Sequence, residues 1–149
     1  MSIGKAGGGQ LPKITGGKAH AARLRFMTSP EAMASVGRAL FAGGEAIQVE
    51  AQISLTRGAV SGKAHVPSAP GTPPNQDTGV LGNNIETVQV AIDQVEVSSN
   101  APYAAAQEFG NSRLPARPYM APAAAAKRKD VTELVRRAVA HVAKGGIIR

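Results

Sequence analysis

Residues 29–57 read SPEAMASVGRALFAGGEAIQVEAQISLTR, the longest stretch with a regular apolar pattern in this chain of 149 residues. Ser29 suits the N-cap of a helix because its hydroxyl can accept a backbone N–H of the first turn, and Pro30 suits the first helical position. The stretch therefore predicts a long helix that ends at about residue 57. The adjacent pair Gly43-Gly44 is expected to weaken or bend the middle of that helix.

Apolar residues fall on two sides of this predicted helix. At 100° per residue, the stripe expected to face the core contains Met33, Val36, Leu40, Gly44, Ile47, Ala51 and Leu55. The candidates for a subunit interface lie on the opposite side and are Ala39, Ala42, Ala46, Val49 and Ile53. A solvated surface would carry charges there, so the second stripe predicts burial against a neighbouring subunit or against a loop of the same chain.

The composition is that of one small domain with a thin core. The chain is 43% hydrophobic but only 3% aromatic, so Ala, Val, Ile and Leu must form most of the core. The length fits a single domain, which we place at residues 29–149, after a flexible basic arm at residues 1–28 that is rich in Gly and Lys. A thin core favours an oligomer, because an interface buries apolar surface that a small core cannot.

Positive charge gathers near both ends of the sequence. The chain has 17 Lys and Arg against 10 Asp and Glu, a formal charge of +7, which favours a polyanionic neighbour. The candidates to face DNA all precede the first acidic residue and are Lys5, Lys13, Lys18, Arg23 and Arg25. The alternative is that these charges only keep flexible ends in solution.

Residues 86–99, ETVQVAIDQVEVSS, alternate between apolar and polar side chains and predict an antiparallel hairpin with its turn at residues 93–94. All of its apolar side chains would then share one face. The predicted cross-strand pairs are Ile92 with Val95 and Val90 with Val97.

The remaining elements complete an α+β fold. Residues 102–109 predict a short helix that Gly110 ends, residues 116–120 a third strand, and residues 122–144 a C-terminal helix. We expect a small antiparallel sheet packed against the long N-terminal helix and the C-terminal helix. The segment between the first helix and the hairpin, residues 58–79, contains four prolines and four glycines and predicts a long extended loop.

The sequence contains no recognisable catalytic arrangement. The histidines His20, His65 and His141 are far apart, and there is no cysteine. The stretch GAVSGK at residues 58–63 has three residues between its glycines where a phosphate-binding loop has four, and Ala64 stands where that loop needs Ser or Thr. We therefore expect no enzyme activity, no metal and no cofactor. No signal peptide or membrane span is apparent.

Three motifs occur in a fixed order along the chain. Residues 70–81 read PGTPPNQDTGVL, residues 103–110 read YAAAQEFG, and residues 115–123 read PARPYMAPA. Behind a long N-terminal helix, they resemble the head–tail joining, or tail completion, proteins of long-tailed bacteriophages. That family shows P-G-x-P-P…T-G-x-L, then Y-A-x-x-x-E-F-G, then P-A-R-P-[FY]-[LM]-x-P-A. The resemblance covers about residues 29–143, so the arm that precedes it inherits no role.

The resemblance implies a structural virion protein that forms a homo-oligomeric ring at the neck of the phage and is made in the host cytoplasm. Its partners would be further copies of itself, head connector or adaptor proteins, tail tube or terminator proteins, and packaged DNA in the channel. It implies no catalytic residue and no membrane. Two alternatives remain open: a tail terminator in the same neck, and a small basic protein that binds nucleic acid.

The resemblance also assigns roles to residues. The structural motif residues are Tyr103, Glu108, Phe109, Gly110, Pro115, Arg117, Pro118 and Tyr119. The joining-loop residues are Pro70, Gly71, Pro73, Pro74, Thr78, Gly79 and Leu81. We expect Phe109 and Tyr119 to anchor their segments in the core, the alternative being direct contact with a partner. We expect Arg117 to pair with a carboxylate of its own or the next subunit. We expect the loop to be the main joining surface, the alternative being a surface loop without partners.

Overall fold

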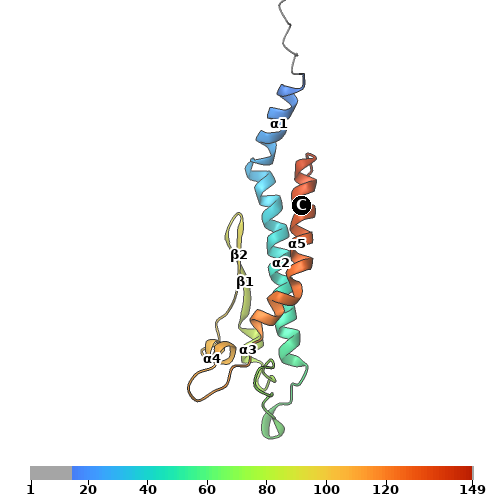
Figure 1. Cartoon of the computed structure of the whole chain (residues 1–149). Coiled ribbons are helices and arrows are strands. Elements are labelled where there is room, and N and C mark those ends of the chain that lie inside the picture. The colour runs from blue at the N-terminus through green and yellow to red at the C-terminus, as the bar shows by residue number, and fades with distance from the viewer. Residues whose placement is uncertain (1–14, 149) are drawn as a thin grey trace, which may run out of the picture.

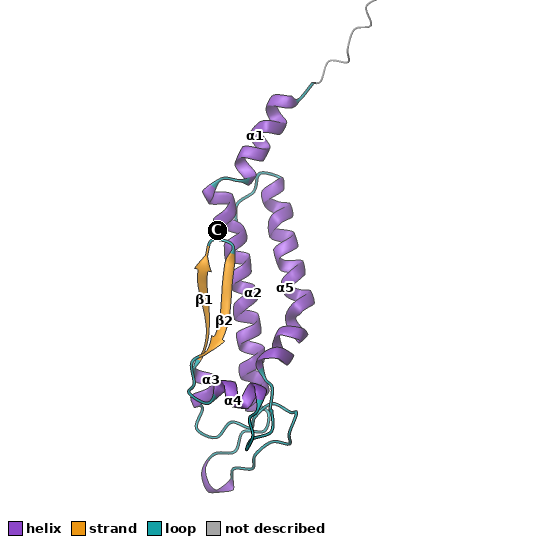
Figure 2. Ribbon diagram, turned by 60° about the vertical axis from the view of Figure 1, so that its left-hand side comes forward, coloured by secondary structure: helices purple, strands orange, loops and turns teal. Residues whose placement is uncertain are grey.

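The computed structural model describes residues 15–148. In this part of the chain, five α-helices and a two-stranded antiparallel sheet confirm the α+β class (Figure 1). The elements are α1 (Gly17–Met27), α2 (Pro30–Thr56), a 3-10 turn (Gly62–Ala64), α3 (Val80–Asn83), β1 (Ile85–Ala91), β2 (Gln94–Ser99), α4 (Ala104–Phe109) and α5 (Met120–Ala143). The molecule is elongated, and the long helix α2 contacts both α5 and the hairpin (Figure 2).

The predicted start of the long helix is confirmed. The Ser29 hydroxyl accepts the N–H of Ala32 at 3.3 Å, and Pro30 is the first residue of α2. The helix continues without interruption through Gly43 and Gly44 to Thr56. The pair thus lies in the middle of a continuous helix, where both residues are buried.

The two glycines allow close packing on two sides of α2. A Cβ at Gly43 would lie 2.8 Å from Cγ1 of Val131 on α5. A Cβ at Gly44 would lie 2.7 Å from Cγ2 of Thr87 on β1 and 2.8 Å from Cγ1 of Val95 on β2. Real Cβ atoms do not approach other carbons so closely, so neither neighbour could keep its position against a larger residue.

The hairpin forms where it was predicted, but its predicted register is wrong. The turn is at Ile92-Asp93, one residue earlier than expected, and the pairing shifts between Gln89 and Ala91. Thr87 therefore opposes Val97, Gln89 opposes Val95, and Val88 opposes Glu96. Opposed residues share a face of the sheet, so an offset in pairing separates the apolar side chains that the sequence pattern had placed together.

The consequence is a hairpin with apolar side chains on both faces. Val95 and Val97 lie toward α2, next to Gly44. The side chains expected to share their face stay open to solvent, with Val88 43%, Val90 53% and Ile92 46% exposed.

Two further expectations differ from the structure. The third strand predicted at residues 116–120 does not form. Residues 116–119 have no regular structure, and α5 already begins at Met120, where a side chain of α4 binds the backbone N–H groups. Residues 17–27, expected to be an arm without regular structure, form α1, in keeping with the strong helix formers Ala, Arg, Leu and Met in that stretch. Lys5 and Lys13 lie outside the described residues.

The core lies where the second half of α2, α3, α4 and the start of α5 meet. Small side chains dominate it, as the composition predicts, and Tyr119 is its largest member. The buried cluster contains Ala51, Leu55, Leu81, Ile85, Ala101, Ala104, Tyr119 and Ala123.

We predict that Gly44→Ala destabilises the protein although alanine is the better helix former. The gain of about 1 kcal/mol in helix propensity should be outweighed by about 1–3 kcal/mol of overpacking against Thr87 and Val95. Denaturant unfolding measures the difference. Gly17→Ala is the matched control, because no atom lies within 4 Å of a Cβ at that helical glycine. Equal midpoints for Gly44→Ala and wild type would refute the packing argument.

Candidate functional site

Glu108 joins the two motif segments through the start of α5. Its Oε2 accepts the N–H groups of Tyr119 and Met120 at 2.8 and 3.0 Å, and its Oε1 accepts the N–H of Ala121 at 2.9 Å. These N–H groups lie at the beginning of a helix, where no carbonyl of the helix can reach them. A carboxylate satisfies them and complements the positive end of the helix dipole. Glu108 therefore fixes α4 against α5.

The expectation that Tyr119 anchors the core is confirmed, because only 1% of its surface is exposed. Burial raises the pKa of its phenol, and the negative charge of Glu108 acts in the same direction.

The expectation that Phe109 anchors the core is wrong, because its side chain is 80% exposed. Ala104 and Glu108, one turn apart on α4, face the core and α5, and Phe109 lies about 140° around the helix from Ala104. A helix of six residues has one buried side, and Phe109 lies off it.

Gly110 allows a tight turn after α4, and Arg117 ties the segment that follows to the long loop. Gly110 has φ +70°, and a Cβ there would lie 2.7 Å from the backbone N of Ala116, so the position suits only glycine. The Arg117 Nε donates to the backbone oxygen of Ser68 at 2.9 Å, and the N–H of Gly71 donates to the oxygen of Ala116 at 2.8 Å. Arg117 thus binds a carbonyl of the loop, and no carboxylate within residues 15–148 forms an ion pair with it. Pairing with a carboxylate of the next subunit stays a prediction.

The loop of residues 58–79 is docked on the body of the protein over much of its length. The N–H of Gln76 donates to the oxygen of Leu55 at 3.0 Å, and Pro74 is buried. Gly79 and Leu81 are buried as well, so these joining-loop residues are covered by their own chain and are not open to a partner. Of the other joining-loop residues, Pro70, Gly71 and Thr78 are exposed, and Pro73 is half-buried.

An apolar groove opens beside α4 and the start of α5. Its volume is about 640 Å³, and it lies between β2, α4, the start of α5 and the middle of α2. Phe109 lines this groove. The other apolar side chains along the groove include Ile47, Val95, Val97, Met120 and Ala124.

The candidate interface stripe of α2 divides into a covered part and an open part. Ala39 is 5% exposed and Ala46 half-buried, so Ala39 in particular is covered by its own chain and does not belong to an open interface. Val49 is 51% exposed, Ile53 is 43% exposed, and Ala42 is exposed too. Burial within the same chain thus holds for Ala39, whereas burial of the open residues Ala42, Val49 and Ile53 against a neighbouring subunit stays a prediction.

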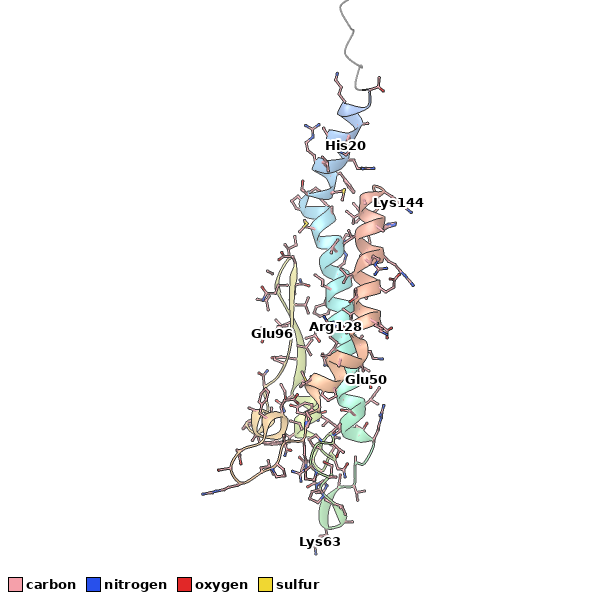
Figure 3. All side chains as sticks on the ribbon, viewed as in Figure 1. His20, Glu50, Lys63, Glu96, Arg128 and Lys144 are labelled. Carbon is pink, nitrogen blue, oxygen red and sulfur yellow. The ribbon has the colours of Figure 1, made fainter. Side chains whose placement is uncertain are left out.

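The basic helix α1 and the end of α5 lie at the same end of the molecule, whereas Arg128 of α5 lies near Glu50 in its middle (Figure 3). Helix α1, with Lys18, Arg23 and Arg25, contacts α5. Figure 3 shows His20 and Lys144 near one end and Lys63 at the other.

Part of the positive charge on the helices is matched by nearby carboxylates. Glu50 of α2 lies 3.3 Å from Lys127 and 3.7 Å from Arg57. Glu133 lies 3.3 Å from Arg136 and 3.1 Å from Arg137.

Sequence reasoning missed the polar side chains of α2 that hold other elements. Gln48 Nε2 donates to the oxygen of Ile85 at 2.9 Å, and Gln52 Nε2 donates to the oxygen of Gly82 at 3.0 Å. The buried Ser35 hydroxyl accepts the N–H of Ile148, which pins the C-terminal tail to α2. The available signal was the spacing of polar residues within an apolar helix, which alone does not reveal their partners.

Within residues 15–148, no group of three or more His, Cys, Asp or Glu side chains is placed to hold a metal ion. In the same part of the chain, no helix has the length and apolar character needed to cross a bilayer.

Comparisons with protein-family models, with curated proteins and with solved structures found no match to this chain. The arguments about function therefore rest on the motifs and on what their residues do in the structure. Those residues form one connected unit, in which Glu108 holds α5 and Arg117 holds the loop.

We predict that Glu108→Ala destabilises the protein by about 2–3 kcal/mol, because three N–H groups at the start of α5 lose a charged acceptor. Chemical denaturation measures the loss. Glu45→Ala removes an exposed carboxylate from α2 and should change stability by less than about 0.5 kcal/mol. Similar losses for the two variants would contradict the capping role.

We predict that alkaline pH destabilises the protein partly through Tyr119. Its folded-state pKa lies above the unfolded value of about 10, so the unfolded chain loses the phenolic proton first. This contribution to stability is full below about pH 10 and falls as the pH rises toward the folded-state pKa. Tyr119→Phe should lose less unfolding free energy than wild type between about pH 9 and 11. Parallel pH profiles for the two proteins would rule this contribution out.

Proposed function

We propose that this protein is a structural subunit of a phage neck, which forms a ring that completes the tail and joins it to the DNA-filled head. The proposal begins from the motif resemblance. The structure supports the proposal in that the motif residues hold neighbouring elements together. Glu108 fixes the start of α5 to α4, and Arg117 fixes the loop to the segment that joins these two helices. A rigid, precisely shaped edge is what a subunit needs to fit repeatedly against copies of itself.

The single observation that carries the ring is the pair of open apolar surfaces on opposite sides of α2. Ile47 lines the groove beside Phe109, whereas Val49 is half-exposed on the open part of the candidate interface stripe. Residues two apart in a helix point about 200° apart, so the groove and the stripe face away from each other. Head-to-tail contacts in a ring use two different patches of each subunit. The protein presents two such patches.

The exposed aromatic ring of Phe109 strengthens this argument. A large apolar side chain that is 80% exposed beside an apolar groove is typical of a surface that a partner covers. A partner could also bury apolar surface that the small core does not cover, because side chains of α2 and of the hairpin remain exposed.

A second candidate function, binding of nucleic acid by the free subunit, is favoured by the exposed basic residues Lys18, Arg23 and Arg25 of α1. The two functions differ in their response to salt. A dedicated DNA-binding protein loses affinity steeply as salt rises, because phosphate contacts release counterions. A ring subunit alone should bind duplex DNA weakly at every salt concentration.

The test is a phage genome that lacks this gene. We predict full heads and separate tails of normal length, seen by electron microscopy, with infectivity restored by the wild-type protein supplied in trans. Tails of abnormal length would instead indicate a terminator, and normal infectious particles would exclude a neck function.

The open part of the candidate interface stripe, which contains Ala42, Val49 and Ile53, is tested in the same complementation assay with Val49→Glu. A charge at this exposed position should leave the fold intact and abolish joining, because it would be buried against the next subunit. Thr132→Glu places the same charge on an exposed site of α5 and serves as the control. Full complementation by Val49→Glu would remove the stripe from the interface.

A further inference from the structure

Helix α1 is a basic helix with little support from the part of its own chain that the structure describes. None of its eleven residues is buried, although α1 contacts both α2 and α5. An isolated helix of this length is marginal in water, so α1 needs a partner surface to be stable. Leu24, 49% exposed, lies between Arg23 and Arg25, and no acidic residue precedes Glu31 in the sequence. The partner surface should therefore be apolar in the middle and acidic around it.

The outer face of the hairpin has this character. Val88 and Val90 on this face are 43% and 53% exposed. Glu96 of β2 stands opposite Val88 of β1. Glu86 lies two residues before Val88 on the same strand, so it shares this face. No Lys or Arg occurs between residues 63 and 113, so the acidic charge of this face has no cation from its own strands.

We infer that α1 of one copy docks on the outer face of the hairpin of a second copy, with Leu24 against Val88 and Val90 and with Arg23 and Arg25 beside Glu86 and Glu96. This inference rests on the proposed ring and names one pair of surfaces that joins neighbouring copies. Opposite charges with an apolar centre give the contact both a register and a fixed partner.

The hairpin of the same chain does not receive α1. Within one copy, α1 contacts α2 and α5, and it projects beyond the body of the molecule, away from the sheet (Figure 1). The projecting helix is therefore free to reach a neighbour.

The rival partner is DNA, to which the basic residues of α1 were first assigned. DNA would neutralise Lys18, Arg23 and Arg25 but would leave Leu24 in water. The hairpin offers carboxylates and exposed valines together, which matches α1 in both respects.

The experiment uses cysteine pairs, since the chain has no cysteine of its own. Leu24→Cys and Val88→Cys proteins are prepared separately, mixed and oxidised, so that a disulfide between the two variants reports contact between copies. We expect at least about tenfold more mixed dimer than from Leu24→Cys with Ser112→Cys, an exposed loop position, because docking raises the local concentration of the two thiols. Yields equal to those of the control, or no mixed dimer at all, overturn the inference.

Charge reversal makes the test specific. Adding Glu86→Lys and Glu96→Lys to the Val88→Cys protein should reduce the yield of mixed dimer to that of the control pair. Adding Arg23→Glu and Arg25→Glu to the Leu24→Cys protein should do the same. Mixing the two reversed proteins should restore the excess of mixed dimer, because opposite charges then meet again. All four positions are exposed, so folding should survive. Failure to restore the excess counts against the contact.

The outcomes also separate this inference from its rival and from the proposed function. If Arg23→Glu with Arg25→Glu weakens binding to duplex DNA while the disulfide yield stays at the control level, DNA is the partner of α1 and the inference is wrong. If the same variants complement the gene deletion fully and the disulfide excess is absent, the contact fails while the neck function stands.

Discussion

The architecture depends on how closely two elements can approach α2. Val131 of α5 occupies the space where Gly43 lacks a side chain, and the hairpin does the same at Gly44. Consecutive residues of a helix point about 100° apart, so the pair opens two adjacent sides of α2 at one level. A side chain at either position would push one element outward, and the whole hairpin or helix would move with it. Both α5 and the hairpin pack against α2 in the elongated molecule (Figure 1).

Polar side chains fix the segments that close packing against α2 does not hold. Between Phe109 and Met120 the chain has no regular structure, so its backbone groups need other partners. Glu108 supplies an acceptor for the start of α5, and Arg117 supplies a donor for the loop. On α2, Gln48 holds the first residue of β1 through its carbonyl. These side chains explain why a chain with so few aromatic residues still fixes a long loop and a short helix in place.

A core of small side chains has consequences for assembly. Burial is concentrated around Tyr119, while Val49, Val90 and Phe109 remain at the surface. Neighbouring copies can supply the missing burial, and charge can direct them, since the hairpin is acidic and α1 is basic.

The sequence by itself determined the local structure. Capping and periodicity predicted α2 from its first residue, the hairpin, the short helix that Gly110 ends, and α5, because these signals act between residues a few positions apart. It also identified Tyr119 as a core anchor. Only the tertiary structure decided the register of the hairpin, the exposure of Phe109 and the partners of Glu108 and Arg117. A one-residue change at a turn reverses which face a side chain occupies, and a hydrogen bond over many residues depends on how whole elements pack. The two glycines of α2 illustrate the difference: the sequence shows a weak point in a helix, and only the neighbours in space show that α5 and the hairpin pack closely against it.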